Sequence, residues 1–438
     1  MSQRVSFAAI SIACVLAMVG NQNCAPVNFK GAEPSAQGTT ISSTGVPNPV
    51  VAGSITSVPT GNPGTDVVIP VNPGPGPFAF PIPVTIKEKL KSRKNFGSCC
   101  FGDKRTGTSI PECPHIKGIG TAQSPYEIHE PRDIACVDYA PDAHWNLKAD
   151  ITIRPEDYQK SKLKRFVPIR CFGGVFDGEF RKIRHEVDCS KFDCSGKSES
   201  VIPNIALIGQ VGGVIMNLHL EADYRARAPQ KRGTQVASGL GTESIGSLVL
   251  RVSMKGRFDV DAQYITGLIN SDNPFDEFSL YVEQAGAEFE VINPKPHNPQ
   301  YTAGLLSGAD RSFISNSYAK HNHFRKQHGT GSIGLVSSFG FEKGSNVQNS
   351  FHAGDFALES CGVPFKPLVS GGSAKNSFWT GTVKDKKGNV CEQVARTVPY
   401  MDLQRNGPAL SGVFDEFGFD DQYWSRGADG LPKLRWIP

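Results

Sequence analysis

The segments IALIGQV (205–211) and IMNLHLE (215–221) decide the fold, because their pattern returns along the rest of the chain. The first is an apolar run containing glycine, and the second is a strand in which polar and apolar residues alternate. Copies of the second type include ISNSYAK (314–320), VQNSFHA (347–353) and AKNSFWT (374–380). Alternation of this kind is typical of β-strands that bury one face.

A small polar residue in each alternating segment marks the period of the repeat. These residues are Asn217, Ser247, Ser279, Asn316, Asn349 and Asn376. Their successive spacings of 30, 32, 37, 33 and 27 residues indicate stacked repeats. The elements are short, β-rich and bounded by turn residues, which argues against a helical solenoid. The sequence therefore predicts an all-β, right-handed parallel β-helix in which the asparagines form a polar ladder at one corner.

The composition divides the chain into three segments. Residues 1–23 are expected to be a signal segment, because Arg4 precedes an apolar run that is too short to span a membrane comfortably. Residues 24–95 are rich in Pro, Gly, Ser and Thr, which predicts a disordered, flexible spacer. Residues 96–438 carry the repeats and are expected to form the β-helix.

Cys24 follows the apolar run directly, as the lipidated cysteine does in bacterial lipoprotein signals. Lipidation at Cys24 would anchor the protein to a membrane, and ordinary secretion is the alternative. We therefore expect an exported protein, either a lipoprotein of the outer membrane or cell surface, or a secreted protein. No second segment is apolar and long enough to span a bilayer.

Eleven cysteines favour an oxidising compartment. Cys189 and Cys194 are candidates for a local disulfide, and Cys361 and Cys391 are candidates for a disulfide late in the chain. The other cysteines beyond the signal and Cys24 form an odd group, which suggests one unpaired thiol. No pair of motifs with zinc-ligand spacing occurs, so we expect no metal site and no cofactor.

Composition and charge narrow the classes of function. The formal net charge of +4 is small for 438 residues, so we expect no nucleic-acid binding. Asp259 and Asp261 alternate in FDVDAQ and share a strand face, which makes them weak candidates for an acid/base pair. Solvated surface carboxylates are the simpler interpretation of this pair.

The segment YAKHNHFRKQHGTG (318–331) has the most unusual composition of the chain. His321 and His323 share a strand face, and Arg325 and His328 follow closely. These four residues are candidates for binding an acidic glycan, and an exposed polar loop is the alternative interpretation.

Aromatic residues recur at comparable places in the alternating strands, namely Tyr281, Tyr318, Phe351 and Trp379. A ladder of rings along the outside of a rod would stack sugars or receive a protein partner. Packing in the core would explain the same pattern, and both interpretations stay open at this stage.

Several segments resemble the GLUG-repeat β-helix proteins of bacterial surfaces. The most telling is FGGVFDG (172–178), and GIGTAQSPYEIHEPRDIA (118–135), HWNLKADITI (144–153) and FDDQYWSRGADGLPKLRWIP (419–438) resemble other parts of that family. The resemblance implies a β-helix that works outside the cell, often in adhesion.

We therefore expect a cell-surface or secreted adhesin or ligand-binding β-helix without evident catalytic machinery. Its partner would be a surface glycan or a protein receptor, and an oligomer is possible. A polysaccharide lyase or glycosidase that uses outward carboxylates is the alternative, and a structural component of a surface appendage is the third hypothesis.

Overall fold

A computed structural model gives the arrangement of the repeats. The chain divides into two compact units, Met1–Gly61 and Asn62–Pro438, and every described residue lies in the second. The structure describes residues 107–158, 167–189, 204–226, 234–244, 246–260, 262–270, 280–292, 301–307, 312–324, 334–337, 345–358, 360–361, 368, 372–385, 387–391, 402–403 and 419–437. The expected signal segment and the whole of the expected spacer therefore lie outside the described residues.

Most of the described residues belong to β-strands, which confirms the predicted all-β class. The larger sheet consists of β1 (Tyr126–Ile128), β2 (His144–Leu147), β3 (Ile151–Ile153), β5 (Val175–Asp188), β7 (Val214–Ala226), β10 (Leu248–Val260), β13 (Tyr281–Glu283), β14 (Gly286–Val291), β16 (Phe313–Ser315), β17 (Tyr318–Phe324), β19 (Ser345–Gln348), β20 (Phe351–Ala353), β21 (Phe356–Leu358), β22 (Gly372–Lys375), β23 (Phe378–Thr380), β24 (Val383–Asp385) and β25 (Asp402–Leu403).

A second sheet forms another side of the coil. It consists of β4 (Ile169–Phe172), β6 (Ile208–Val211), β8 (Thr234–Ser238), β9 (Gly241–Ser244), β11 (Ala262–Thr266), β12 (Ile269–Asn270), β15 (Tyr301–Ser307) and β18 (Gly334–Ser337). The remaining elements are the 3-10 helix η1 (Pro131–Tyr139), the single helical turn α3 (Pro155–Tyr158), and the hairpin β26 (Trp424–Arg426) with β27 (Pro432–Leu434). No described helix has the length and hydropathy of a membrane span.

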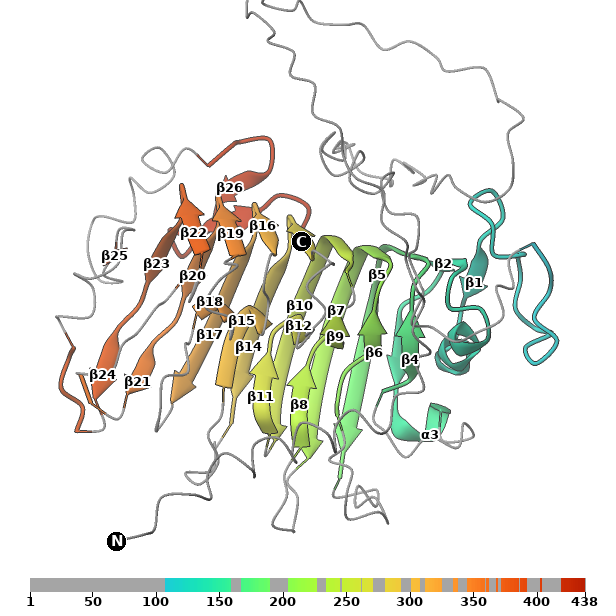
Figure 1. Ribbon diagram of the computed structural model, residues 1–438, viewed down its shortest axis with the longest axis horizontal. Coiled ribbons are helices and arrows are strands. Elements are labelled where there is room, and N and C mark those ends of the chain that lie inside the picture. Colours follow the sequence, from blue (N-terminus) through green and yellow to red (C-terminus); the bar gives the residue numbers. More distant parts are fainter. Residues whose placement is uncertain are drawn as a thin grey trace, which may run out of the picture. The chain divides into compact units, whose positions relative to one another are not determined.

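The strands stack as a parallel β-helix, as the sequence predicts. In the larger sheet β1 pairs with β2, β2 with β5, β5 with β7 and β7 with β10, always in parallel. The second sheet repeats the arrangement, since β4 pairs with β6 and β6 with β9 in parallel (Figure 1). Each coil of the chain therefore lies on the preceding one, and successive strands lie about 4.8 Å apart.

Apolar side chains at equivalent positions of successive coils form the core. Trp145 pairs with Phe176, Phe176 with Ile215, and Ile215 with Val249. All four side chains are almost completely buried. Because side chains alternate along a strand, the residues on either side of this column point out of the coil.

A residue in the left-handed backbone conformation turns the chain at one corner of each coil. These residues are Asn217, Arg251, Gln284, Asn316, Asn349 and Asn376, with φ between 46° and 53°. The four asparagines of the predicted ladder therefore lie at this corner. Arg251 and Gln284 occupy it in the intervening coils, because the register pairs Met216 with Leu250 and Leu250 with Glu283. Ser247, which marks the period in the sequence, lies four residues before Arg251, and Ser279 lies outside the described residues.

Serines next to the corner stabilise successive coils in the later part of the helix. The hydroxyl of Ser317 accepts a hydrogen bond from the N–H of Ala285, that of Ser350 from Ser317, and that of Ser377 from Ser350, at 3.0–3.2 Å. The Ser350 hydroxyl also donates to the carbonyl of Gln348, two residues back. The repeated Asn-Ser pair thus supplies both the turn and a hydrogen bond between coils.

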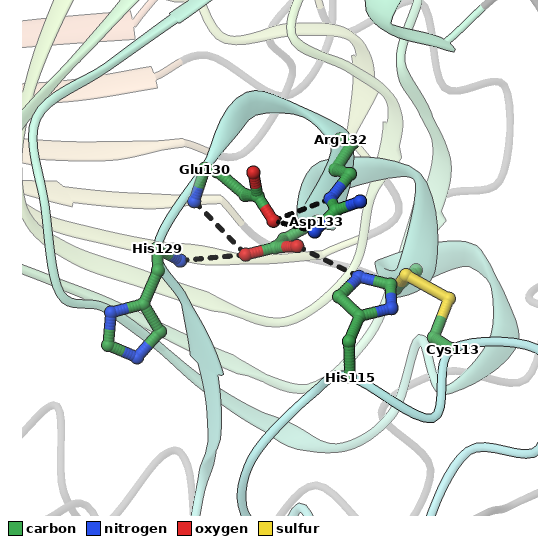
Figure 2. Close-up of a disulfide and its surroundings, with 7 residues drawn as sticks. Cys113, His115, His129, Glu130, Arg132 and Asp133 are labelled. Atoms are coloured by element: carbon green, nitrogen blue, oxygen red, sulfur yellow. Dashed lines mark hydrogen bonds and ion pairs between the residues drawn. A yellow bond between two sulfur atoms is a disulfide. The ribbon is translucent and has the colours of Figure 1, made fainter.

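Asp133 organises the N-terminal end of the described fold (Figure 2). One carboxylate oxygen accepts the N–H groups of His129 (2.9 Å) and Glu130 (3.0 Å), which fixes the start of η1. The other lies 3.0 Å from Nε2 of His115. The adjacent disulfide joins Cys113, two residues before His115, to Cys136 within η1. The disulfide and the contact between His115 and Asp133 therefore hold the residues before β1 against η1.

The second disulfide joins Cys361 to Cys391, which is the late pairing considered from the sequence. Cys171 takes part in a disulfide, and so does Cys189. Cys194, the predicted partner of Cys189, lies outside the described residues, as does Cys24. Stable disulfides of this number favour an oxidising compartment.

The C-terminal hairpin covers the outer face of the last coils. Tyr318, Phe351 and Phe378 come from successive strands and stack with ring centroids 5.3 and 5.2 Å apart and nearly parallel planes. Trp424 of β26 packs against Phe351 at 5.9 Å, and Phe419 packs against Phe378 at 5.7 Å. All five side chains are nearly or fully buried.

Candidate functional site

A polar cleft of about 500 Å³ lies beside the first coils. We call it the outer cleft. Its described side chains with ionisable or amide groups are Gln123, Glu127, His144, Asn146, Lys148, Asp177 and Glu179. Strands β1, β2 and β5 carry five of these residues, and Lys148 directly follows β2. Because these strands pair in register, the backbone holds the lining residues in fixed relative positions.

Strand alternation explains why these side chains meet. Glu127 pairs with Asn146 and Asn146 pairs with Asp177, so the three stand in one column on adjacent strands. The neighbouring column, Trp145 and Phe176, is buried in the core. The polar column must therefore face away from the core, toward the cleft.

The two carboxyl groups of β5 have different partners. Oδ1 of Asp177 accepts the side-chain amide of Asn217 and the N–H of Glu179, both at 2.9 Å. Oε1 of Glu179 accepts the amide of Asn146 at 2.8 Å and the ammonium of Lys148. Asp177 is only 2% exposed, whereas the side chain of Glu179 is 22% exposed.

Burial shifts the pKa values of Asp177 and His144 in the outer cleft. Burial, with the negative charge of Glu179 adding to it, raises the pKa of Asp177 above its ordinary value. The amide of Asn217 and the charge of Arg251 oppose this shift without cancelling it. Burial lowers the pKa of His144, so its ring favours the neutral form.

The corner next to the cleft depends on a glycine. A Cβ atom on Gly178 would lie 2.4 Å from the carbonyl oxygen of Asn217 and 2.8 Å from Cα of Leu218. Two residues with positive φ follow, Glu179 (47°) and Phe180 (57°). Positive φ recurs at this corner in later coils, so here it is a property of the fold and is not by itself a sign of function.

Of the two carboxylates proposed from the sequence, the structure describes only Asp259. Asp259 lies near the end of β10, half-buried, and pairs with Arg225 of β7. It does not line the outer cleft. Asp261 lies outside the described residues.

His321 is the first of the four residues that the sequence suggested for binding an acidic glycan, and its position in the structure corrects that suggestion. His321 is 3% exposed and stacks on Phe289 with ring centroids 4.7 Å apart, and its Nε2 lies 2.9 Å from Nε2 of His352. A glycan outside the coil would not reach this buried ring. His323 belongs to β17, whereas Arg325 and His328 lie outside the described residues. Within the described ranges, no cluster of three or more potential metal-ligating side chains is found.

The rings of the aromatic ladder are covered in two different ways. Trp379 packs in the core of the coil, whereas Tyr318 and Phe351 stack on its outer face under the C-terminal hairpin. All three are at most 4% exposed. Tyr281 is half-buried and stacks on Phe313 at 5.1 Å. Core packing is therefore the correct interpretation for Trp379, and the hairpin closes the outward rings of Tyr318 and Phe351 to a sugar.

The sequence analysis missed the outer cleft, although its residues other than Glu179 stand in three quoted segments, 118–135, 144–153 and 172–178. The available signal was the alternation in HWNLK, which places His144, Asn146 and Lys148 on one face. A single strand does not show that Asp177, some thirty residues later, belongs to the same column.

Comparisons with known proteins give one similar structure. No protein family matches the sequence, and no curated protein does. One similar solved structure is a "putative immunoglobulin A1 protease" from Bacteroides ovatus, with a TM-score of 0.47 and 13% identity. The match covers 73% of this chain and 95% of that chain. The parallel pairing of this chain's own strands defines it as a parallel β-solenoid, and the resemblance to GLUG-repeat proteins remains an interpretation of its sequence.

Proposed function

We propose that this protein is an exported surface protein whose β-helix binds a glycan in the outer cleft. The observation that carries the proposal is the cleft itself, about 500 Å³ in volume and lined by polar side chains from paired strands. Carboxylates accept hydrogen bonds from sugar hydroxyls, whereas amide and ammonium groups donate to sugar oxygens. A rigid set of such groups is suited to a ligand that is covered with hydroxyls.

The cellular setting belongs to the same proposal. Residues 1–23 would direct export, Cys24 would carry a lipid, and residues 24–95 would extend the binding domain away from the membrane. The disulfides support an oxidising compartment. Mass spectrometry of the mature N-terminus tests this part, and an unprocessed chain that begins at Met1 would contradict it.

Binding should be measured with the full chain and a panel of neutral and acidic oligosaccharides, by calorimetry. We expect Asp177→Asn and Glu127→Gln to weaken binding by about tenfold or more, because each replaces a carboxyl group that would hydrogen-bond to a sugar hydroxyl. Glu186→Gln is the matched control, since Glu186 lies on β5 and does not line the outer cleft.

Two outcomes would contradict glycan binding in the outer cleft. One is that no oligosaccharide of the panel binds. The other is that the cleft variants bind as tightly as the unmodified protein, which would place the ligand elsewhere on the solenoid.

A further inference from the structure

The outer cleft holds two carboxyl groups in opposite surroundings. The hydrogen-bond donors described around Asp177 are neutral, and neither hydrogen bond uses its Oδ2 atom. The carboxylate of Glu179 is bound by the ammonium of Lys148. Burial among neutral donors favours a protonated carboxyl group, and burial raises the pKa of Asp177. A buried carboxyl group close to a more exposed one, each with its own partners, is an arrangement that general acid/base chemistry uses.

A second observation in the same cleft points to a ligand. Nδ1 of His144 is buried and has no hydrogen-bond partner among the described residues. A buried nitrogen without a partner costs free energy, which a hydroxyl group of a bound sugar would recover. Because burial lowers the pKa of His144, its neutral ring can offer either a donor or an acceptor to that hydroxyl, depending on the tautomer.

The charges of the cleft favour a neutral ligand. Among the described lining residues, three carboxyl groups, those of Glu127, Asp177 and Glu179, stand together with one ammonium group. That ammonium group, on Lys148, already binds Glu179. An acidic sugar would therefore meet repulsion from the carboxylates, and the described lysine of the lining is already engaged.

We propose that Asp177 and Glu179 hydrolyse a glycosidic bond of a neutral glycan held in the outer cleft. The inference rests on the proposed function, because the glycan must bind in this cleft before it reacts. Asp177 is the general acid, since it is the carboxyl group that keeps its proton more readily. Glu179 is the general base, since its more exposed carboxyl group is oriented by the amide of Asn146 and the ammonium of Lys148.

The proposed step balances with water as the other reactant. Asp177 gives its proton to the glycosidic oxygen, the bond between this oxygen and the anomeric carbon breaks, and the leaving sugar departs with a hydroxyl group. Glu179 takes a proton from a water molecule while the water oxygen bonds to the anomeric carbon. Glu179 then releases its proton to solvent and Asp177 regains one, which restores both groups.

The test uses the full chain and fluorescently labelled neutral oligosaccharides, with product length followed by chromatography. We expect shorter products with the unmodified protein and a loss of about 100-fold or more in rate with either Asp177→Asn or Glu179→Gln. Glu186→Gln, on the same strand outside the cleft, should keep the original rate.

An activated substrate separates the two catalytic roles. A dinitrophenyl glycoside has a leaving group that needs no proton, so Asp177→Asn should regain most of its rate on this substrate, whereas Glu179→Gln should not. A purely structural role for Asp177 would slow both substrates equally and would overturn the assignment. Binding without any shortening would overturn the hydrolysis and leave glycan binding standing, whereas absence of binding would contradict both proposals.

Discussion

The outer faces of the first and last coils are built on the same repeated strand, yet one is a polar cleft and the other is closed. Beside β1, β2 and β5 the outward side chains include Asn146 and Asp177, and they line the outer cleft. Beside β17, β20 and β23 the outward side chains include Tyr318 and Phe351, and the C-terminal hairpin covers them. The repeated strand thus provides the same backbone at both ends. The outward side chains, and whether another segment covers them, decide whether a coil can bind a ligand.

The difference also concerns how each end is stabilised. Close to the cleft, the segment before η1 is held by a disulfide and by Asp133. At the other end, ring packing under Trp424 takes this role. We therefore expect the two ends to respond differently to mutation and to pH, and four predictions test this comparison.

The largest effect should come from Trp424→Ala. Trp424 is fully buried over the stacked rings, and its removal leaves a cavity and uncovers Phe351. We expect a loss of about 3–5 kcal/mol in unfolding free energy of the last coils, measured by urea titration and hydrogen exchange. Trp436→Ala is the control, because Trp436 is only partly buried and should cost clearly less. Equal losses would contradict the special role of Trp424.

The second prediction concerns Glu283, which lies near the C-terminal segment, and the pH range from 4.5 to 7. Burial raises the pKa of Glu283 from 4.5 to about 7. Between these values the folded state binds more protons than the unfolded state, so stability should fall as pH rises from 4.5 to 7. The expected change is about 3 kcal/mol. The variant Glu283→Gln should lack this component of the pH dependence in urea titrations, and an unchanged slope would refute it.

The third prediction is that the early coils lose stability as the pH falls, which is the opposite of the dependence expected from Glu283. Burial lowers the pKa of His185 from 6.5 to about 3, and its ring contacts Tyr224. Below pH 6.5 the unfolded state binds the extra proton first, so stability should fall as pH falls toward 3. The loss should be about 2 kcal/mol at pH 5. We expect His185→Gln to remove this component. A variant with the same acid sensitivity as the unmodified protein would show that another group is responsible.

The smallest effect should come from the corner at Asn349, where φ is 48°. Asn349→Ala should cost about 1 kcal/mol more than Asn349→Gly, because a Cβ atom strains a left-handed backbone and both variants lose the same side-chain hydrogen bond. Urea titration of the two variants gives the difference directly. If the alanine variant were as stable as the glycine variant, backbone strain would not set the residue preference of this corner.

The periodicity of the sequence was sufficient for the fold class and for part of the corner ladder. The asparagines at 316, 349 and 376 were recognisable because Asn tolerates the left-handed conformation and is followed each time by Ser. Arg251 and Gln284 occupy the same corner without that signature, so the sequence spacing pointed to nearby serines instead. The register of the β-strands identified them.

The candidate site was much less predictable. His321 and Asp259 attracted attention through local composition, but a local pattern does not tell which side of a coil a residue faces or what covers it. Conversely, Asn146, Asp177 and Glu179 are ordinary residues in ordinary strands. Their significance appears only when the pairing of β2 with β5 places them around one cleft.

The sequence by itself determined that the chain forms short, stacked β-strands, because alternation and period depend on neighbouring residues and on the repeat length. Only the tertiary structure decided which outward faces stay accessible. The C-terminal hairpin reaches back to Tyr318, more than a hundred residues earlier, and closes that face. Contacts between such distant segments leave no periodic trace in the sequence, so the closed aromatic face and the outer cleft became visible only in the folded chain.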